Sequence, residues 1–207
     1  MGRKALNKAR KSDPAKVAAW MNTLFPKVQD QPVQQLTMDE FAALIGITKA
    51  TLYAYLPGKD ALLKALLAEK LGSIAAYQRI LSDTTQHHSE RLRAVLAQLA
   101  GELEDISNDF LSRVQEYFPE VWQDVEAFLE LAFEHLGNFY VSGMEAGVFR
   151  PFPPALLIAN DRLYFRLMTD PAFLRQHGLS VQQALQSYLD LRFHGLINGN
   201  QDSKPNK

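Results

Sequence analysis

A short run of small, polar and basic side chains stands in the first third of the chain, at Thr48, Lys49, Ala50 and Thr51. Hydroxyl and ammonium groups donate hydrogen bonds to phosphate oxygens, and small side chains at a helix end allow close approach to base edges in the DNA major groove. Further hydroxyl and ammonium groups lie nearby in the sequence. The pattern predicts a set of DNA-contacting residues: Thr37, Thr48, Lys49, Ala50, Thr51, Tyr53, Tyr55 and Lys59.

Two short helices are needed to present this set, and the sequence marks the start and the end of the first. Thr37 and Glu40 have the spacing of a capping box, so a helix is expected to begin after Thr37. Gly46 is expected to end it, because glycine adopts the left-handed backbone conformation at little cost. An earlier helix is expected over 17–25, followed by an irregular, Pro-containing connection over 26–35.

The second short helix would carry most of the predicted contacts. Thr48 is a good helix cap, which predicts a helix over 48–55 with Leu52 facing inward. A third helix is expected to open at Lys59 and to extend into the region of Leu81. The arrangement is a helix-turn-helix, whose second helix enters the major groove. On the exposed side of that second helix we expect Lys49, Thr51, Tyr53 and Tyr55.

Charge is divided unevenly along the chain. Residues 1–70 contain 11 Lys or Arg and 6 Asp or Glu, a net charge of +5, whereas residues 71–207 contain 11 and 17, a net charge of −6. Phosphate binding requires the positive charge to lie with the helix-turn-helix. Five of the positive charges fall within residues 1–11, and we interpret residues 1–12 as a flexible basic arm.

In the remaining two-thirds of the chain, the sequence pattern predicts a series of helices and no strand. The expected fold is therefore all-α. Broad apolar patterning over 119–145 indicates a helix with two neighbours, which are either core on both sides or core and a ligand cavity. Both alternatives stay open. Such a cavity would take a small apolar or aromatic effector. Its expected walls are Trp122, Phe133, Tyr140, Asn160, Tyr164 and Phe165. The other expected helices lie at 90–103, 109–118, 155–168, between Asp170 and Gly178, and at 181–197 after a cap at Ser180.

The helix-turn-helix resembles that of the tetracycline-repressor (TetR) family of bacterial regulators. The resemblance covers about the first third of the chain and includes a first helix that ends in Leu24 and Phe25. Ile45, Ala50 and Leu56 depart from the usual residues of the family, and the change at Ala50 bears on base preference. The matching positions are Gly46, Ile47, Thr48, Leu52, Tyr53, Tyr55, Leu56 and Lys59.

The resemblance implies a homodimer that represses transcription at a palindromic operator and is released by a ligand. The dimer would form through the last two long helices, roughly 154–169 and 180–197. A monomeric bundle would use the same apolar residues, so dimerisation rests on the family. Two alternatives remain: a DNA-binding factor without an effector, and a helical enzyme or protein-interaction module in which the helix-turn-helix is structural.

The chain is expected to comprise the arm, a DNA-binding domain over 13–60, an effector-binding and dimerisation domain over 61–198, and a disordered tail over 199–207. It contains no cysteine, no signal-peptide pattern and no apolar run of membrane-spanning length, which favours a cytoplasmic location. No motif for catalysis, a metal or another cofactor is indicated.

Overall fold

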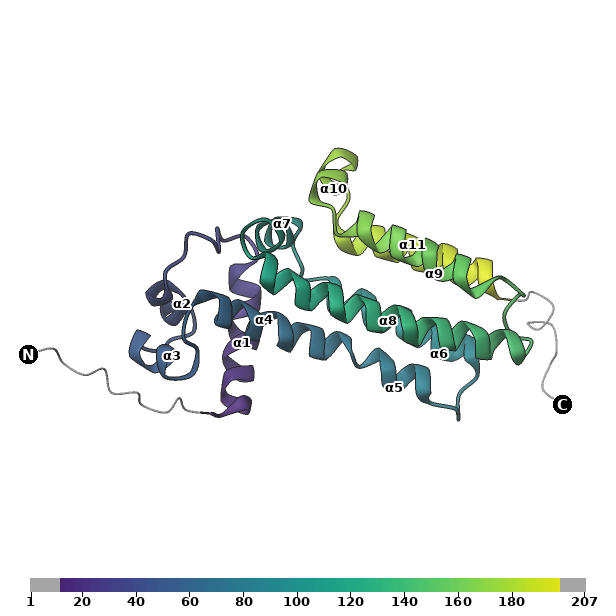
Figure 1. Cartoon of the computed structure of the whole chain (residues 1–207), viewed down its shortest axis with the longest axis horizontal. Helices are drawn as coiled ribbons and strands as arrows, with labels where there is room; N and C mark the ends of the chain where they lie inside the picture. Colours follow the sequence, from purple (N-terminus) through teal and green to yellow (C-terminus); the bar gives the residue numbers. More distant parts are fainter. Residues whose placement is uncertain (1–11, 198–207) are drawn as a thin grey trace, which may run out of the picture.

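The computed structural model describes residues 12–197, and over this range the chain is all-α, as predicted. Figure 1 shows the helices in their order along the chain. Within the described range, extended backbone pairs only in a single bridge between Phe149 and Ile197. The helices are α1 (Pro14–Val28), α2 (Met38–Leu44), α3 (Lys49–Tyr55), α4 (Lys59–Ile74), α5 (Tyr77–Ser82), α6 (His88–Leu103), α7 (Asn108–Tyr117), α8 (Pro119–Glu145), α9 (Pro154–Met168), α10 (Pro171–His177) and α11 (Val181–Leu196).

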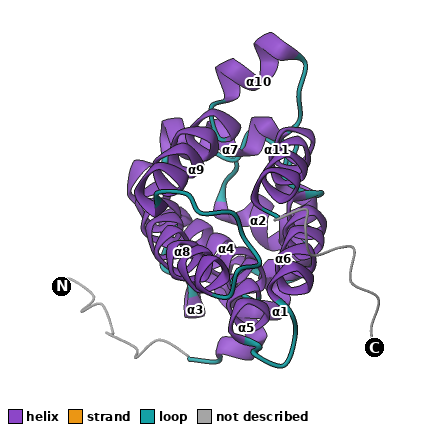
Figure 2. Ribbon diagram, turned by 90° about the vertical axis from the view of Figure 1, so that its right-hand side faces the viewer, coloured by secondary structure: helices purple, strands orange, loops and turns teal. Residues whose placement is uncertain are grey.

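The first three helices and the start of α4 form a head at one end of the elongated molecule, on the left in Figure 1. α1 lies across α4, and α2 packs on α3. α4 then leaves the head and packs against α8 and α6 in the larger body. α9 packs on α8, and α11 packs on α6, which Figure 2 shows from the end of the molecule. One helix is thus shared between head and body.

A single apolar core continues from the head into the body. Phe41 of α2 and Leu52 of α3 are fully buried, and they belong to the same cluster as Phe110 of α7 and Leu185 of α11. The prediction that Leu52 faces inward is confirmed. Burying a large apolar side chain contributes about 1.5–3 kcal/mol, so head and body stabilise one another through this shared core.

α1 continues further than the sequence predicted. The irregular connection was expected to cover 26–35, but the helix runs through Pro26 to Val28. A proline inside a helix removes a main-chain hydrogen bond. One tertiary effect and one local contact offset that loss: Val28 is fully buried in the core, and the side chain of Gln29 donates to the carbonyl of Phe25, four residues earlier, at 2.9 Å. The expectation was wrong for these first three residues, because burial overrode local preference.

The helix expected from Lys59 to the region of Leu81 is broken in two. α4 ends at Ile74 and α5 begins at Tyr77. The side-chain amide of Gln98, on α6, donates to the carbonyls of Ser73 at 3.1 Å and Ile74 at 3.4 Å. Carbonyls at a helix end need partners of this kind. The break therefore depends on a residue far away in the sequence, which no local pattern could reveal.

A buried polar contact joins α8, α9 and α11. The Asp161 carboxylate is fully buried, accepts from the hydroxyl of Tyr140 at 3.0 Å and pairs with the guanidinium of Arg192. Burial raises the pKa of the Tyr140 hydroxyl, which therefore stays protonated and donates. A buried charge must be paired and hydrogen-bonded. Asp161 thus fixes how α9 and α11 sit on α8.

We predict that Gly143→Ala destabilises the fold. Gly143 lies in α8 against the buried ring of Phe149, and an added Cβ would lie 2.1 Å from the Cδ2 atom of that ring. Overpacking of this kind costs about 1–3 kcal/mol, to be measured by chemical denaturation. The control is Gly101→Ala on α6, where an added Cβ meets nothing within 4 Å. Alanine should raise stability there by about 0.5–1 kcal/mol. Equal effects at both positions would contradict the packing argument.

Candidate nucleic-acid interface

The first helix of the motif begins at the predicted capping box. The main-chain N–H of Thr37 donates to the Glu40 carboxylate at 2.7 Å, and the N–H of Glu40 donates to the Thr37 hydroxyl at 3.3 Å. Hydrogen bonds from the main chain and the hydroxyl of Thr37 hold the pKa of Glu40 below its ordinary value. The start of α2 is therefore fixed by two residues that the sequence singled out.

The turn between α2 and α3 follows from Gly46 and Thr48. Gly46 has φ +73°, the left-handed conformation that the sequence predicted. Thr48 caps α3, because its hydroxyl accepts from the N–H of Thr51 at 3.2 Å and lies 2.9 Å from the Thr51 hydroxyl. Ile47, between them, packs against the apolar core. This geometry directs the N-terminal end of α3 outward.

The outer side of α3 carries most of the predicted contact residues. Thr48, Lys49, Ala50 and Tyr53 are exposed, and Thr51 is half-buried. Thr37, at the start of α2, is exposed as well. These side chains lie at the end of the molecule furthest from α9 and α11, as Figure 1 shows for α3. The head can therefore approach a duplex without the body intervening.

Tyr55 is less exposed than the sequence indicated. Its ring packs edge-on against Trp20 of α1, with 5.1 Å between ring centroids, and it is half-buried. The ammonium of Lys16 lies 5.4 Å from the centroids of both rings. An aromatic residue at a half-exposed helix position often finds a partner on a neighbouring helix, and here that partner comes from α1.

Two predicted lysines already have partners within the head. The ammonium of Lys49 lies 2.6 Å from the carboxylate of Asp39, and this contact holds the pKa of Lys49 above its ordinary value. The ammonium of Lys59 is half-buried and donates to the carbonyl of Gln34 at 2.7 Å. Sequence reasoning missed Asp39, because its pairing with Lys49 arises from the angle between α2 and α3 rather than from spacing along one helix.

Comparisons with known proteins agree with this geometry. The sequence model described as "Bacterial regulatory proteins, tetR family" matches residues 28–66. The HTH-type transcriptional regulator YvaF of Bacillus subtilis (strain 168) is 23% identical over 161 residues, 77% of this chain and 85% of that relative. A TetR transcription regulator of Haloarcula marismortui ATCC 43049 superposes with a TM-score of 0.70 at 16% identity, covering 89% of this chain and 100% of the other. FadR of Bacillus subtilis, in complex with stearoyl-CoA, superposes with a TM-score of 0.63 at 15% identity, covering 85% and 97%.

A capped helix-turn-helix on a larger helical body defines a DNA-binding transcriptional regulator. The helix-turn-helix domain of the chain is that of the TetR family of such regulators. The members of this family are regulators rather than enzymes, which sets aside the enzyme alternative. Among residues 12–197, no helix has the length and the apolar character needed to cross a membrane.

The body contains a cavity of about 120 Å³ between α4, α6, α8 and the C-terminal helices. Its walls are largely apolar, and one cationic residue, Lys70, contributes to them. Of the expected wall residues, Trp122, Phe133 and Phe165 line it. The long helix α8 therefore faces both core and an apolar cavity, rather than core on both sides.

The other three expected wall residues lie outside this cavity. Tyr140 turns toward Asp161 in a separate apolar cluster. Asn160 is exposed to solvent. Tyr164 stacks on Tyr188 with 4.2 Å between ring centroids. The aromatic residues of the expected wall are buried or half-buried, but residue type could not tell which side of a helix meets the cavity.

Asp39 pairs with Lys49, one of the residues predicted to contact DNA, so we predict that Asp39→Asn strengthens DNA binding. Freeing one cation should steepen the dependence of log affinity on log salt by about 0.9, which a titration at several salt concentrations would measure. The control is Asp60→Asn, which removes an exposed negative charge from the start of α4. If both variants change the DNA affinity and its salt dependence equally, the change in net charge alone explains the effect. The release of Lys49 would then not be the cause.

Proposed function

We propose that the chain is a homodimeric repressor that binds a palindromic operator and releases it when a small apolar molecule occupies the body cavity. The observation that carries the proposal is the exposed N-terminal end of α3, where Thr48, Lys49 and Ala50 lie free of the body. In this reading, the head over 13–60 binds DNA, and the body over 61–198 dimerises and receives the effector.

The residues proposed to contact DNA divide by chemistry. Ala50 and Thr51 sit where a major-groove helix meets base edges, and their small size permits close approach. Hydroxyl and ammonium groups suit phosphate contacts, which set the position of the protein on the duplex. For Lys59 such a contact requires the ammonium to keep or exchange its bond to Gln34. The residues proposed for phosphate contacts are Thr37, Thr48, Lys49, Tyr53, Tyr55 and Lys59.

We predict that Tyr53→Ala combined with Lys49→Ala abolishes specific DNA binding without unfolding the protein. The operator duplex would first be selected from a random DNA library and then titrated at two salt concentrations. Losing two contacts of about 1.4 kcal/mol each lowers affinity roughly 100-fold. A matched control, Tyr117→Ala with Lys64→Ala, removes an exposed tyrosine and a lysine outside the helix-turn-helix. If the double variant bound the selected operator normally, the proposed contacts would be wrong.

Exposed leucines on the last two long helices support dimerisation. On α9, Leu156, Leu163 and Leu167 are 67%, 63% and 41% exposed, and their spacing of seven and four residues puts them on one side of the helix. On α11, Leu191 is 74% exposed. Clustered apolar exposure of this kind marks an interaction surface. A two-fold dimer through α9 and α11 would cover it and would present two heads to two half-sites of a palindrome.

We predict that Leu163→Glu converts the dimer to a monomer, because burying an unpaired carboxylate in an apolar interface is unfavourable. Light scattering after size-exclusion chromatography measures the mass directly. Tyr117→Glu provides the control, since this side chain is 49% exposed at the C-terminal end of α7 and belongs to neither α9 nor α11. A dimer that persists in Leu163→Glu would place the interface elsewhere, and operator affinity should then also remain unchanged.

The walls of the cavity support an apolar or aromatic effector. Trp122, Phe133 and Phe165 provide aromatic surface, and the volume of about 120 Å³ is of the order that admits a single aromatic ring. The ammonium of Lys70 already pairs with Glu102 and Asp105. A charged ligand would have to break these pairs, so a neutral molecule fits the cavity better. The solved FadR structure that this chain resembles is a complex with stearoyl-CoA, which supports the binding of a small molecule by a protein of this fold.

A further inference from the structure

We propose that a groove between α5 and α8 binds an anionic group, a carboxylate or a phosphate, through Arg79 at its edge and the charge of Arg91 against its wall. This α5–α8 groove is distinct from the apolar cavity and from the helix-turn-helix, and its volume is about 510 Å³. Its apolar wall residues are Leu81 and Phe139. Its polar wall residues are Gln78, Arg79, Ser82, His135, Asn138 and Ser142.

Arg91, on α6, carries a buried positive charge without a counter-ion. The residue is only 5% exposed. One of its terminal nitrogens donates to the carbonyl of Leu81 at 2.7 Å, whereas its Nε atom is buried and has no hydrogen-bond partner. Within residues 12–197, Arg91 forms no ion pair. A buried charge is unfavourable unless it is paired, so an anion close to this guanidinium would stabilise it.

Two titratable neighbours respond to the charge of Arg91 but do not pair with it. Hydrogen bonds from Thr85 lower the pKa of Asp83, and the charge of Arg91 adds a smaller effect. The Asp83 carboxylate already accepts from the main-chain N–H and the hydroxyl of Thr85. Burial, followed by the charge of Arg91, lowers the pKa of His88, so this imidazole is neutral at neutral pH. The guanidinium therefore keeps an unpaired charge.

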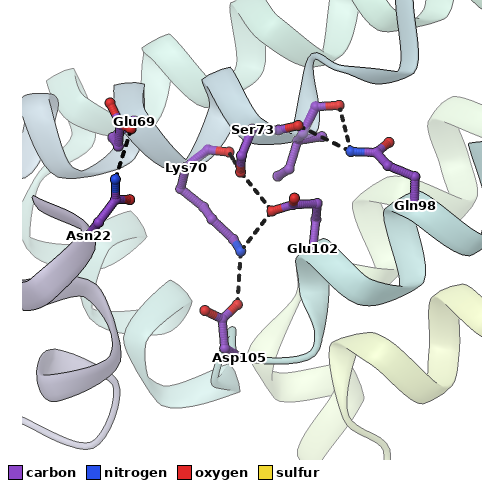
Figure 3. A network of polar contacts seen from close by, with 8 residues as sticks. Asn22, Glu69, Lys70, Ser73, Gln98, Glu102 and Asp105 are labelled. Atoms are coloured by element: carbon purple, nitrogen blue, oxygen red, sulfur yellow. Dashed lines mark hydrogen bonds and ion pairs between the residues drawn. The ribbon is translucent and has the colours of Figure 1, made fainter. Parts of the chain in front are cut away.

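Helix capping does not account for that charge. Arg91 bonds the carbonyl of Leu81 near the end of α5, where main-chain carbonyls need partners. At the break before α5, Gln98 fills the same role with a neutral amide, since it donates to the carbonyls of Ser73 and Ile74 (Figure 3). Both side chains come from α6. A neutral donor would therefore suffice at Leu81 as well, and the buried charge needs another explanation.

The charge of Arg91 acts on the α5–α8 groove. Its Cζ atom lies 5.2 Å from the centroid of the Phe139 ring, and both Phe139 and Leu81 belong to the wall of the groove. Apolar groups weaken an electric field far less than water does. Arg79, in the last turn of α5, is exposed and lines the groove itself. Among the described residues that line the groove, none is acidic, so an anion there would meet two positive charges.

The groove and the apolar cavity are adjacent at one pair of side chains. Tyr77 is buried and lines the cavity, and its hydroxyl lies 2.9 Å from Nδ1 of His135, which lines the groove. An amphipathic molecule that displaces this pair would place its apolar part in the cavity and its anionic group in the groove. That form of the proposal rests on the proposed effector cavity, whereas the binding of a free anion does not.

Three probes distinguish a free anion from the anionic end of a larger molecule. Inorganic phosphate is the free anion, phenylbutyrate joins a carboxylate to an aromatic ring, and phenylbutanol is its uncharged match. Calorimetric titration at constant ionic strength gives the dissociation constants for the natural protein and for Arg79→Gln, Arg91→Gln and Arg91→Lys. Arg93→Gln is the matched control, because it removes an exposed charge of α6 that lies over Phe193 and outside the groove.

We expect the affinity for an anionic probe to fall about tenfold or more in Arg79→Gln and in Arg91→Gln, a loss of about 1.4 kcal/mol each. Arg91→Lys keeps the charge and Arg93→Gln lies outside the groove, so both should stay within about twofold of the natural protein. Phenylbutanol should bind all variants equally, because it carries no charge. Thermal unfolding checks that each variant is folded, and Arg79→Gln, at an exposed position, decides if Arg91→Gln is not.

Arginine-dependent binding of phosphate supports a site for a free anion. Arginine-dependent binding of phenylbutyrate alone supports a site for the anionic end of an effector. Anion affinities that are unchanged in Arg79→Gln and Arg91→Gln, or that fall equally in Arg93→Gln, overturn the site, as does the absence of anion binding. Equal losses in Arg91→Lys and Arg91→Gln overturn the role given to the charge of Arg91.

Phenylbutanol reports on the cavity independently of the groove. If phenylbutanol binds and no anion does, the anion site is wrong and the proposed effector cavity stands. If phosphate binds in the arginine-dependent way and phenylbutanol does not bind, the effector cavity is wrong and the anion site stands.

Discussion

Burial of α4 against α1 on one side and α8 on the other is the interaction on which the rest of the structure depends. Leu62, Leu63, Leu66 and Leu67 are all buried along this helix, and they belong to a core that contains residues of both head and body. At about 1.5–3 kcal/mol for each buried side chain, exposing these leucines would cost an amount comparable with the whole stability of a typical domain. The head can therefore tilt only as α4 tilts, and α4 is itself a wall of the cavity.

Apolar packing holds the helices together, whereas a few buried polar contacts determine how the helices are oriented against one another. Apolar surfaces tolerate small sliding movements, but a hydrogen bond requires a specific distance and angle. The Asp161 carboxylate fixes α9 and α11 on α8, and Gln29 fixes the end of α1 on Ser107. Both lie where helices of different layers meet. Hydrogen bonds of this kind favour a few discrete arrangements of the helices over a continuous range of positions. A switch between a DNA-binding and a released form needs such discrete arrangements.

The electrostatics of the head moderate its attraction for DNA. The N-terminal third of the sequence carries a net positive charge and the remainder a net negative one, which orients the head toward the duplex. Within the head, Asp39 pairs with Lys49, and Lys59 is held by a main-chain carbonyl. These internal partners reduce the charge available to phosphates. With the contacts proposed above, this restrains nonspecific affinity and favours discrimination by base contacts over general attraction.

The sequence by itself determined the motif: Thr37 with Glu40, Gly46 and Thr48 act on their own neighbours, so the start and end of α2 and the start of α3 could be predicted from them. Only the tertiary structure decided the continuation of α1 through Pro26, the break after Ile74, and the pairing of Asp39 with Lys49. It also decided that Tyr164 stacks on Tyr188 while Phe165 meets the cavity. Caps and turns depend on residues within about four positions, whereas these features depend on side chains brought together from distant parts of the chain.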